Sequence, residues 1–117
     1  MDSKAIFEIQ KRLESARTFL RDNAGKYAEA KQIRRYDGDR RKRLLAVKMR
    51  PYIDAGDSNA DATTKAMSEA EYGKEFEEMA KQFQAAEETI ALYEAAETSF
   101  KSAQSLLSFG KAQMGIL

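Results

Sequence analysis

The chain has 117 residues, of which 33% are charged and 43% are hydrophobic, and it carries a net charge of +1 with one proline and no Cys or His. This composition is typical of one polar, helix-rich domain and excludes collagen-like and mucin-like chains. Without Cys and His the chain lacks disulfides, thiol nucleophiles, imidazole bases and the commonest metal ligands. We therefore expect a protein that is not an enzyme and that needs no cofactor and no metal.

The chain contains no run of 18 apolar residues, and its first residues, Met1-Asp2-Ser3-Lys4, do not begin an apolar leader. A membrane-spanning helix needs about 20 consecutive apolar residues, and a secretory signal needs an apolar stretch of about 7–15. We expect a cytoplasmic protein that has no contact with a membrane.

The first predicted element is a helix over about residues 3–53. Its apolar residues recur at helical spacing, at Ile6, Ile9, Leu13, Ala16 and Leu20. Gly25 could end a helix and so divide this region in two, which would make three long helices. The same spacing continues across Gly25, which favours one continuous helix. Beyond it Ile33, Leu44 and Val47 share one side, and we expect that side to face the core.

A connector is predicted over about residues 54–68. Pro51 disfavours helical geometry at the preceding residue, and the segment 54–59 is dense in turn-forming residues. One or two helical turns are possible in residues 60–67. The sequence Ser68-Glu69-Ala70-Glu71 matches a capping box, in which the Ser68 hydroxyl accepts from the Glu71 amide. A second long helix is therefore expected over about residues 69–110.

This second helix carries the clearest pattern in the chain. Apolar residues alternate at steps of four and three, as on the buried side of a coiled coil, at Tyr72, Phe76, Met79, Phe83, Ala86, Ile90 and Tyr93. A strict heptad would then bury Glu97, Gln104 and Lys111. A three-residue step after Tyr93 instead buries a mostly apolar set, Ala96, Phe100, Ala103, Leu107, Gly110 and Met114. We prefer the second phase.

Together these elements predict an all-α fold in which two long helices form an antiparallel coiled-coil hairpin, with residues 1–117 as a single domain. Two helices bury little surface, so we expect two hairpins to dimerise into a four-helix assembly. The residues expected to form the core and the oligomer contact are Ile9, Leu13, Leu20, Phe76, Met79, Phe83, Ile90, Phe100 and Leu107.

The charge is divided unevenly. Residues 1–53 hold 15 Lys/Arg and 7 Asp/Glu, whereas residues 54–117 hold 5 and 12. Eight basic residues fall within residues 34–50, a density that suits binding to nucleic-acid phosphates. In an antiparallel hairpin, however, this segment would lie beside the acidic residues 69–78, so internal pairing is an open alternative.

Helical periodicity separates the basic residues into groups. Arg34, Arg41 and Lys48 flank the expected core side, and Arg40 lies near it. The side chains that point away from the second helix are Arg35, Lys42, Arg43 and Arg50. These four form the candidate nucleic-acid site, which would bind DNA without sequence preference. In the alternative, an acidic surface of Glu69, Glu71, Glu75 and Glu78 binds a protein partner.

Three segments carry a resemblance to a known group of proteins: residues 27–36 (YAEAKQIRRY), the basic stretch 40–49, and residues 68–72 (SEAEY). Their order resembles that of small all-helical proteins that temperate phages encode in the early region near recombination functions. The resemblance implies a location in the host cytoplasm and two roles. One is an accessory to phage recombination that touches DNA. The other is an inhibitor or adaptor acting on a host nuclease or defence complex.

Overall fold

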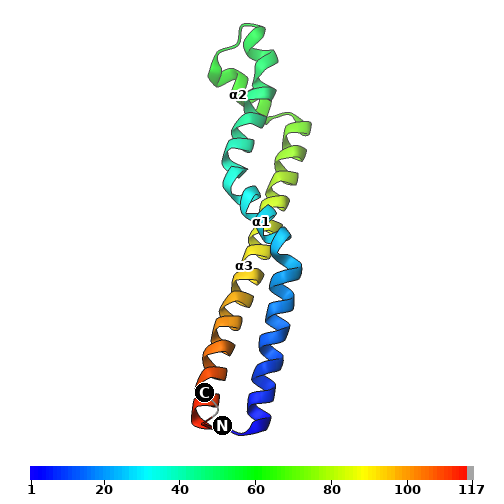
Figure 1. Ribbon diagram of the computed structural model, residues 1–117. Helices are drawn as coiled ribbons and strands as arrows, with labels where there is room; N and C mark the ends of the chain where they lie inside the picture. Colours follow the sequence, from blue (N-terminus) through cyan, green and yellow to red (C-terminus); the bar gives the residue numbers. More distant parts are fainter. Residues whose placement is uncertain (116–117) are drawn as a thin grey trace. The chain divides into compact units, whose positions relative to one another are not determined.

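The computed structural model describes residues 1–115, and these residues form three helices and no strand (Figure 1). The helices are α1 (Ser3–Asp54), α2 (Asn59–Met67) and α3 (Ala70–Gln113). The predicted all-α class is confirmed. Contacts divide the chain into two compact units: unit 1 contains residues 1–28 and residues 88 onward, and unit 2 contains residues 29–87.

Helix α1 runs without interruption through Gly25, so the single-helix prediction is confirmed and the division at this glycine is wrong. Its first turn is capped by Asp2, whose carboxylate accepts from the Ala5 amide at 2.8 Å. Pro51 lies in the last turn, four residues before the helix gives way to a turn. Gly56 follows with a φ of 100°, a conformation that side chains disfavour, and this reverses the chain.

Most of the expected connector is helix α2. Its N-cap is Ser58, whose hydroxyl accepts from the Asp61 amide at 3.2 Å. The predicted capping box at Ser68 is wrong. Ser68 is the C-cap of α2, with φ −83° and ψ −9°, and its hydroxyl donates to the Thr64 carbonyl at 2.7 Å. Because an N-cap residue needs an extended backbone, the helical geometry of Ser68 prevents it from starting α3.

In unit 1 the first part of α1 and the last part of α3 are paired in antiparallel order. The rings of Tyr27 and Tyr93 stack at 4.0 Å, and at the opposite end the Met1 amino group donates to the Gln113 side chain at 3.2 Å. Between them lies a core of small and branched residues, formed by Ile6, Ile9, Ala16, Ile90 and Ala103.

The second phase of the α3 pattern is confirmed as far as Gly110, whereas its last predicted residue, Met114, is exposed. Ala103 is 0% exposed and Gly110 is buried, whereas Gln104, which a strict heptad would bury, is exposed. The Ile6 side chain lies 3.5 Å from the position that a Cβ at Gly110 would occupy. That distance is an ordinary van der Waals contact, whereas the Met1 sulfur lies 2.5 Å from the same position, so Gly110 leaves room for the end of the Met1 side chain.

In unit 2, α2 and the first part of α3 pack on residues 29–54 of α1. Arg34 lies near Glu87 and Lys48 near Glu71, so α1 and α3 are again antiparallel. Small residues dominate the interior, which is formed by Ala30, Leu44, Ala62, Ala66, Tyr72 and Ala86. Helix α2 contributes two alanines that are 0% exposed.

All nine residues predicted for the core and the oligomer contact are at least partly covered, since Ile9 and Ile90 are buried and the other seven are half-buried. The interior position predicted for Val47 is wrong, because this side chain is 61% exposed. After buried Leu44 the next interior position is Lys48, four residues later, and not Val47, three residues later. The aliphatic stem of Lys48 covers the interior while its ammonium group reaches the acids of α3.

Candidate nucleic-acid interface

The four candidate cations all lie on the unit 2 segment of α1, and all four are exposed. Within residues 1–115 no ion pair or hydrogen bond involves the side chains of Lys42, Arg43 or Arg50. The Arg35 guanidinium lies over the ring of Tyr36, with 5.4 Å between its central carbon and the ring centroid. Their positive charge is therefore directed to solvent.

The basic residues on the flank that faces α3 are paired. Lys48 contacts Glu71 at 3.4 Å and Glu75 at 3.2 Å. Arg34 lies 3.6 Å from Glu87. Internal neutralisation thus applies to this flank and leaves the outward residues without acidic partners.

Two further arginines contact neighbouring side chains at the edge of the helix pair. Arg41 contacts Asp37, one turn earlier in α1, at 3.0 Å, and its guanidinium lies 4.8 Å from the centroid of the Phe76 ring. Arg40 donates to the Gln82 side chain at 3.2 Å. The interruption of the apolar pattern at Asp37 and Arg40 therefore corresponds to polar contacts at the edge of the helix pair.

The environment of Lys48 favours its charged form. Partial burial acts to lower its pKa, but the hydrogen bond to Glu75 and the negative charges of Glu71 and Glu75 together outweigh this effect, and its pKa is raised above the ordinary value. Lys48 is therefore a structural cation that holds α1 against α3.

The uneven charge of the sequence is balanced by the fold. Unit 2 contains twelve Lys/Arg and twelve Asp/Glu, because antiparallel packing brings the basic part of α1 beside the acidic part of α3. Residues 29–54 alone hold nine basic and four acidic residues. The positive potential is thus concentrated on the outward side of one helix and is not spread over the unit.

The alternative acidic surface is largely occupied by contacts within the unit. Glu69 accepts a hydrogen bond from the Tyr52 hydroxyl at 2.6 Å. Glu71 and Glu75 both pair with Lys48. Glu78 is the member of this set that is exposed and has no ion-pair partner within the described chain.

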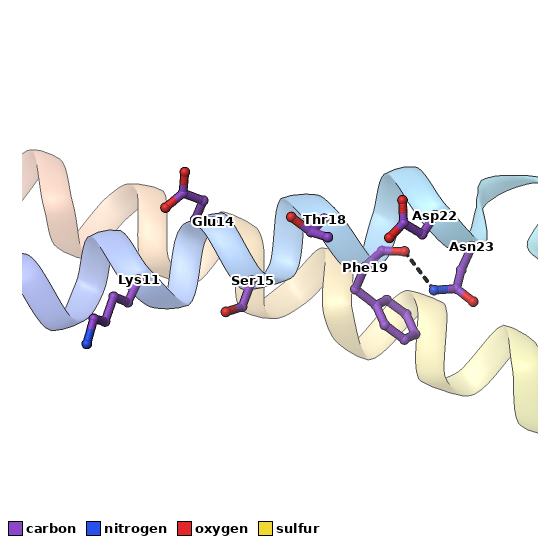
Figure 2. A pocket seen from close by; sticks show the side chains of 7 residues that line it. All are labelled: Lys11, Glu14, Ser15, Thr18, Phe19, Asp22 and Asn23. Atoms are coloured by element: carbon purple, nitrogen blue, oxygen red, sulfur yellow. Dashed lines mark hydrogen bonds between the residues drawn. The ribbon is translucent and has the colours of Figure 1, made fainter.

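A surface furrow of unit 1 runs along α1 between Lys11 and Asn23 (Figure 2). All its lining residues come from this helix, and the Asn23 amide donates to the Phe19 carbonyl at 2.9 Å. Ser15 and Thr18 lie along it without a histidine, which the whole chain lacks.

Residues 1–115 contain no group of three or more potential metal-ligating side chains. The same part of the chain has no helix that is both long enough and apolar enough to cross a membrane.

Comparison with known proteins finds no matching family model, no similar curated protein and no similar solved structure.

The structure also contains a groove in unit 2 that the sequence pattern did not indicate. It has a volume of about 410 Å³ and lies between α1 and α3. Its lining consists of Arg40, Arg43, Leu44, Val47, Lys48, Glu75 and Met79. Periodicity could not indicate it, because the ion pairs that place Lys48 inward and leave Val47 exposed depend on which α3 residues lie opposite.

Proposed function

We propose that this chain is a non-catalytic accessory protein that binds the DNA backbone without sequence preference, in support of recombination or DNA processing of the phage type. The contacts are made by Arg35, Lys42, Arg43 and Arg50. The observation that carries the proposal is that these four cations are exposed and have no acidic partner, although acidic residues neutralise the facing flank of the same helix.

Binding of this kind depends on phosphate neutralisation. Each cation that contacts a phosphate releases condensed counterions, so four contacts give a log–log salt slope of roughly −3.6 on duplex DNA or −2.8 on single strands. The four residues contain no Asn or Gln to read adenine, and isolated cations on one helix face do not specify a base. The proposal therefore includes equal affinity for unrelated sequences.

A salt titration of fluorescent-oligonucleotide binding tests this proposal. Arg35→Glu/Lys42→Glu is compared with wild type and with a matched control, Lys74→Glu/Lys81→Glu, which makes the same charge change at two exposed positions on α3 of the same unit. We expect the first variant to lose binding and the control to lose much less. Absence of wild-type binding at low salt, or equal loss in both variants, would contradict the proposal.

The proposal also includes the antiparallel hairpin of the whole chain and its dimerisation into a four-helix assembly. A dimer would present two cation patches, and simultaneous contact by both would raise the affinity of a surface that is weak alone. The antiparallel contacts within each unit support the hairpin.

An inhibitor or adaptor that binds a host nuclease or defence complex is the second candidate. It is favoured by exposed Val47 and by exposed Glu78, because protein interfaces combine an apolar centre with a polar rim. Affinity capture with and without nuclease treatment separates the two functions. One stoichiometric partner that survives the treatment supports the second candidate, and loss of all partners supports DNA binding.

A further inference from the structure

The groove of unit 2 has an apolar floor and a charged rim. Leu44 is buried, Met79 is half-buried and Val47 is 61% exposed. Arg40 and Arg43 form the basic part of the rim. A large exposed valine beside a methionine is apolar surface that a partner can cover, and the charges around it determine which partner fits.

Two rows of side chains border this groove. On α1, Tyr36, Arg40, Arg43 and Val47 follow steps of four, three and four residues, and so share one helix face. On α3, Glu71, Glu75, Glu78 and Gln82 follow the same steps. The first row is basic and apolar, whereas the second is acidic and polar.

Contacts between the helices show that both rows border the same side of unit 2. Lys48 contacts Glu75 at 3.2 Å, and Arg40 donates to Gln82 at 3.2 Å. On α3, Glu78 lies three residues after Glu75 and four residues before Gln82. It therefore shares their helix face beside the basic row of α1.

Within one copy the two rows do not neutralise each other. Arg40 meets the neutral amide of Gln82, and in the described chain neither Arg43 nor Glu78 has an ion-pair partner. The face therefore presents unpaired positive charge on one helix and unpaired negative charge on the adjacent antiparallel helix, with apolar surface between them.

We propose that this face binds a second copy of the chain. A twofold axis parallel to the helices would place α1 of each copy over α3 of the other. The rotation exchanges the positions of the two rows and leaves each residue at the same height along the helices. Arg43 of one copy then faces Glu78 of the other, twice per dimer, because within one copy Arg40 lies level with Gln82 and Lys48 with Glu75, which sets Arg43 level with Glu78. The charge pattern favours this occupant because the same face supplies both complementary rows.

Arg43 belongs both to this face and to the proposed DNA contacts, whereas Arg35 and Lys42 do not line the groove. The two surfaces can be tested separately. The dimer is tested through Arg43 and Glu78 by mass in the absence of DNA, and DNA binding is tested through Arg35 and Lys42, so either proposal can fail while the other stands.

The experiment uses charge reversal on the full chain. Arg43→Glu and Glu78→Arg are purified separately, and their masses are measured over a concentration series by analytical ultracentrifugation. Each variant alone places two like-charge pairs in the dimer, and we expect its dissociation constant to rise at least about tenfold. Mixing the two variants in equal amounts restores both pairs, so we expect a heterodimer of near wild-type affinity.

The matched control is Glu77→Arg, which makes the same change at an exposed position next to Glu78 but outside the acidic row. It should dimerise as wild type does. Circular dichroism confirms that each variant is helical. A monomeric wild type, unchanged dimerisation of both single variants, or a mixture that dimerises no better than its components would overturn the proposal.

Discussion

The Tyr52 hydroxyl donates a 2.6 Å hydrogen bond to the Glu69 carboxylate and thereby ties the last turn of α1 to the residue that precedes α3. Lys65 of α2 lies over the Tyr52 ring at 5.8 Å and pairs with Asp57 at 2.8 Å. These contacts close the end of unit 2 around α2. They explain why a short helix of nine residues is held in place by polar contacts as well as by two buried alanines.

This arrangement predicts a dependence of stability on alkaline pH. The hydrogen bond to Glu69, together with burial and the charges of Glu69 and Asp57, raises the pKa of Tyr52 above its ordinary value of 10.0. The native state therefore favours the protonated phenol. Its contribution to stability is complete below the unfolded-state pKa and is lost as the pH rises through the higher native pKa.

The comparison is between wild type and Tyr52→Phe, whose ring remains but whose hydroxyl is absent. We expect the free energy of unfolding of wild type to fall more steeply than that of the variant between about pH 9 and pH 11. Urea unfolding followed by circular dichroism measures both. The raised pKa values of Lys48 and Lys65 act in each protein and cancel in the difference. Parallel curves would show that the Tyr52–Glu69 bond contributes no pH dependence.

The close packing of α2 predicts sensitivity to side-chain volume. Ala66 is 0% exposed, so Ala66→Leu inserts three carbon atoms where there is no space. We expect it to lower the free energy of unfolding by about 1–3 kcal/mol. Ala60→Leu is the control, because Ala60 is exposed in the same helix, and its effect should stay below about 0.5 kcal/mol. Equal effects in chemical denaturation would mean that α2 is not packed as described.

The long helices could be predicted from sequence because their apolar periodicity extends over many turns. Small residues belong to this pattern too, because the three-residue step after Tyr93 places Ala103 and Gly110 on the buried side of the helix. The start of α3 could not be predicted from Ser68 alone. A serine before an acidic segment suits either the end of one helix or the start of the next, and the preceding turns of α2 decide between them.

The candidate nucleic-acid site could also be predicted in part from helical periodicity. Periodicity correctly separated outward Arg35 and Lys42 from the flank that includes Lys48, because direction on a helix depends on spacing alone. It failed at Val47, where a lysine took the interior position. Ion pairs with Glu71 and Glu75 make that exchange favourable, and they depend on which α3 residues lie opposite.

The stacked pair in unit 1 predicts a measurable coupling. The rings of Tyr27 and Tyr93 are 4.0 Å apart and inclined by 15°, and they join α1 to α3. A double-mutant cycle with Tyr27→Leu and Tyr93→Leu should give a coupling free energy of about 0.5–1.5 kcal/mol. Additive effects of the two substitutions on unfolding would show that the rings do not interact in solution.

Two glycines provide a final test of the helix boundaries. A Cβ added at Gly25 or at Gly56 would have no atom within 4 Å, so neither substitution by alanine is limited by space. The backbones differ, because Gly25 is inside α1 whereas Gly56 has a φ of 100°. Gly25→Ala removes the entropic cost of a helical glycine and should raise the free energy of unfolding by about 0.5–1 kcal/mol.

Gly56→Ala should do the opposite, since alanine resists a positive φ, and the loss should exceed about 0.5 kcal/mol. Both variants replace glycine by alanine, so the chemical change is the same. Thermal and urea unfolding of each variant and of wild type measure the two effects. Destabilisation by Gly25→Ala would indicate that the chain departs from helical geometry there, because an exposed helical position without steric contacts gives alanine no other way to be worse than glycine.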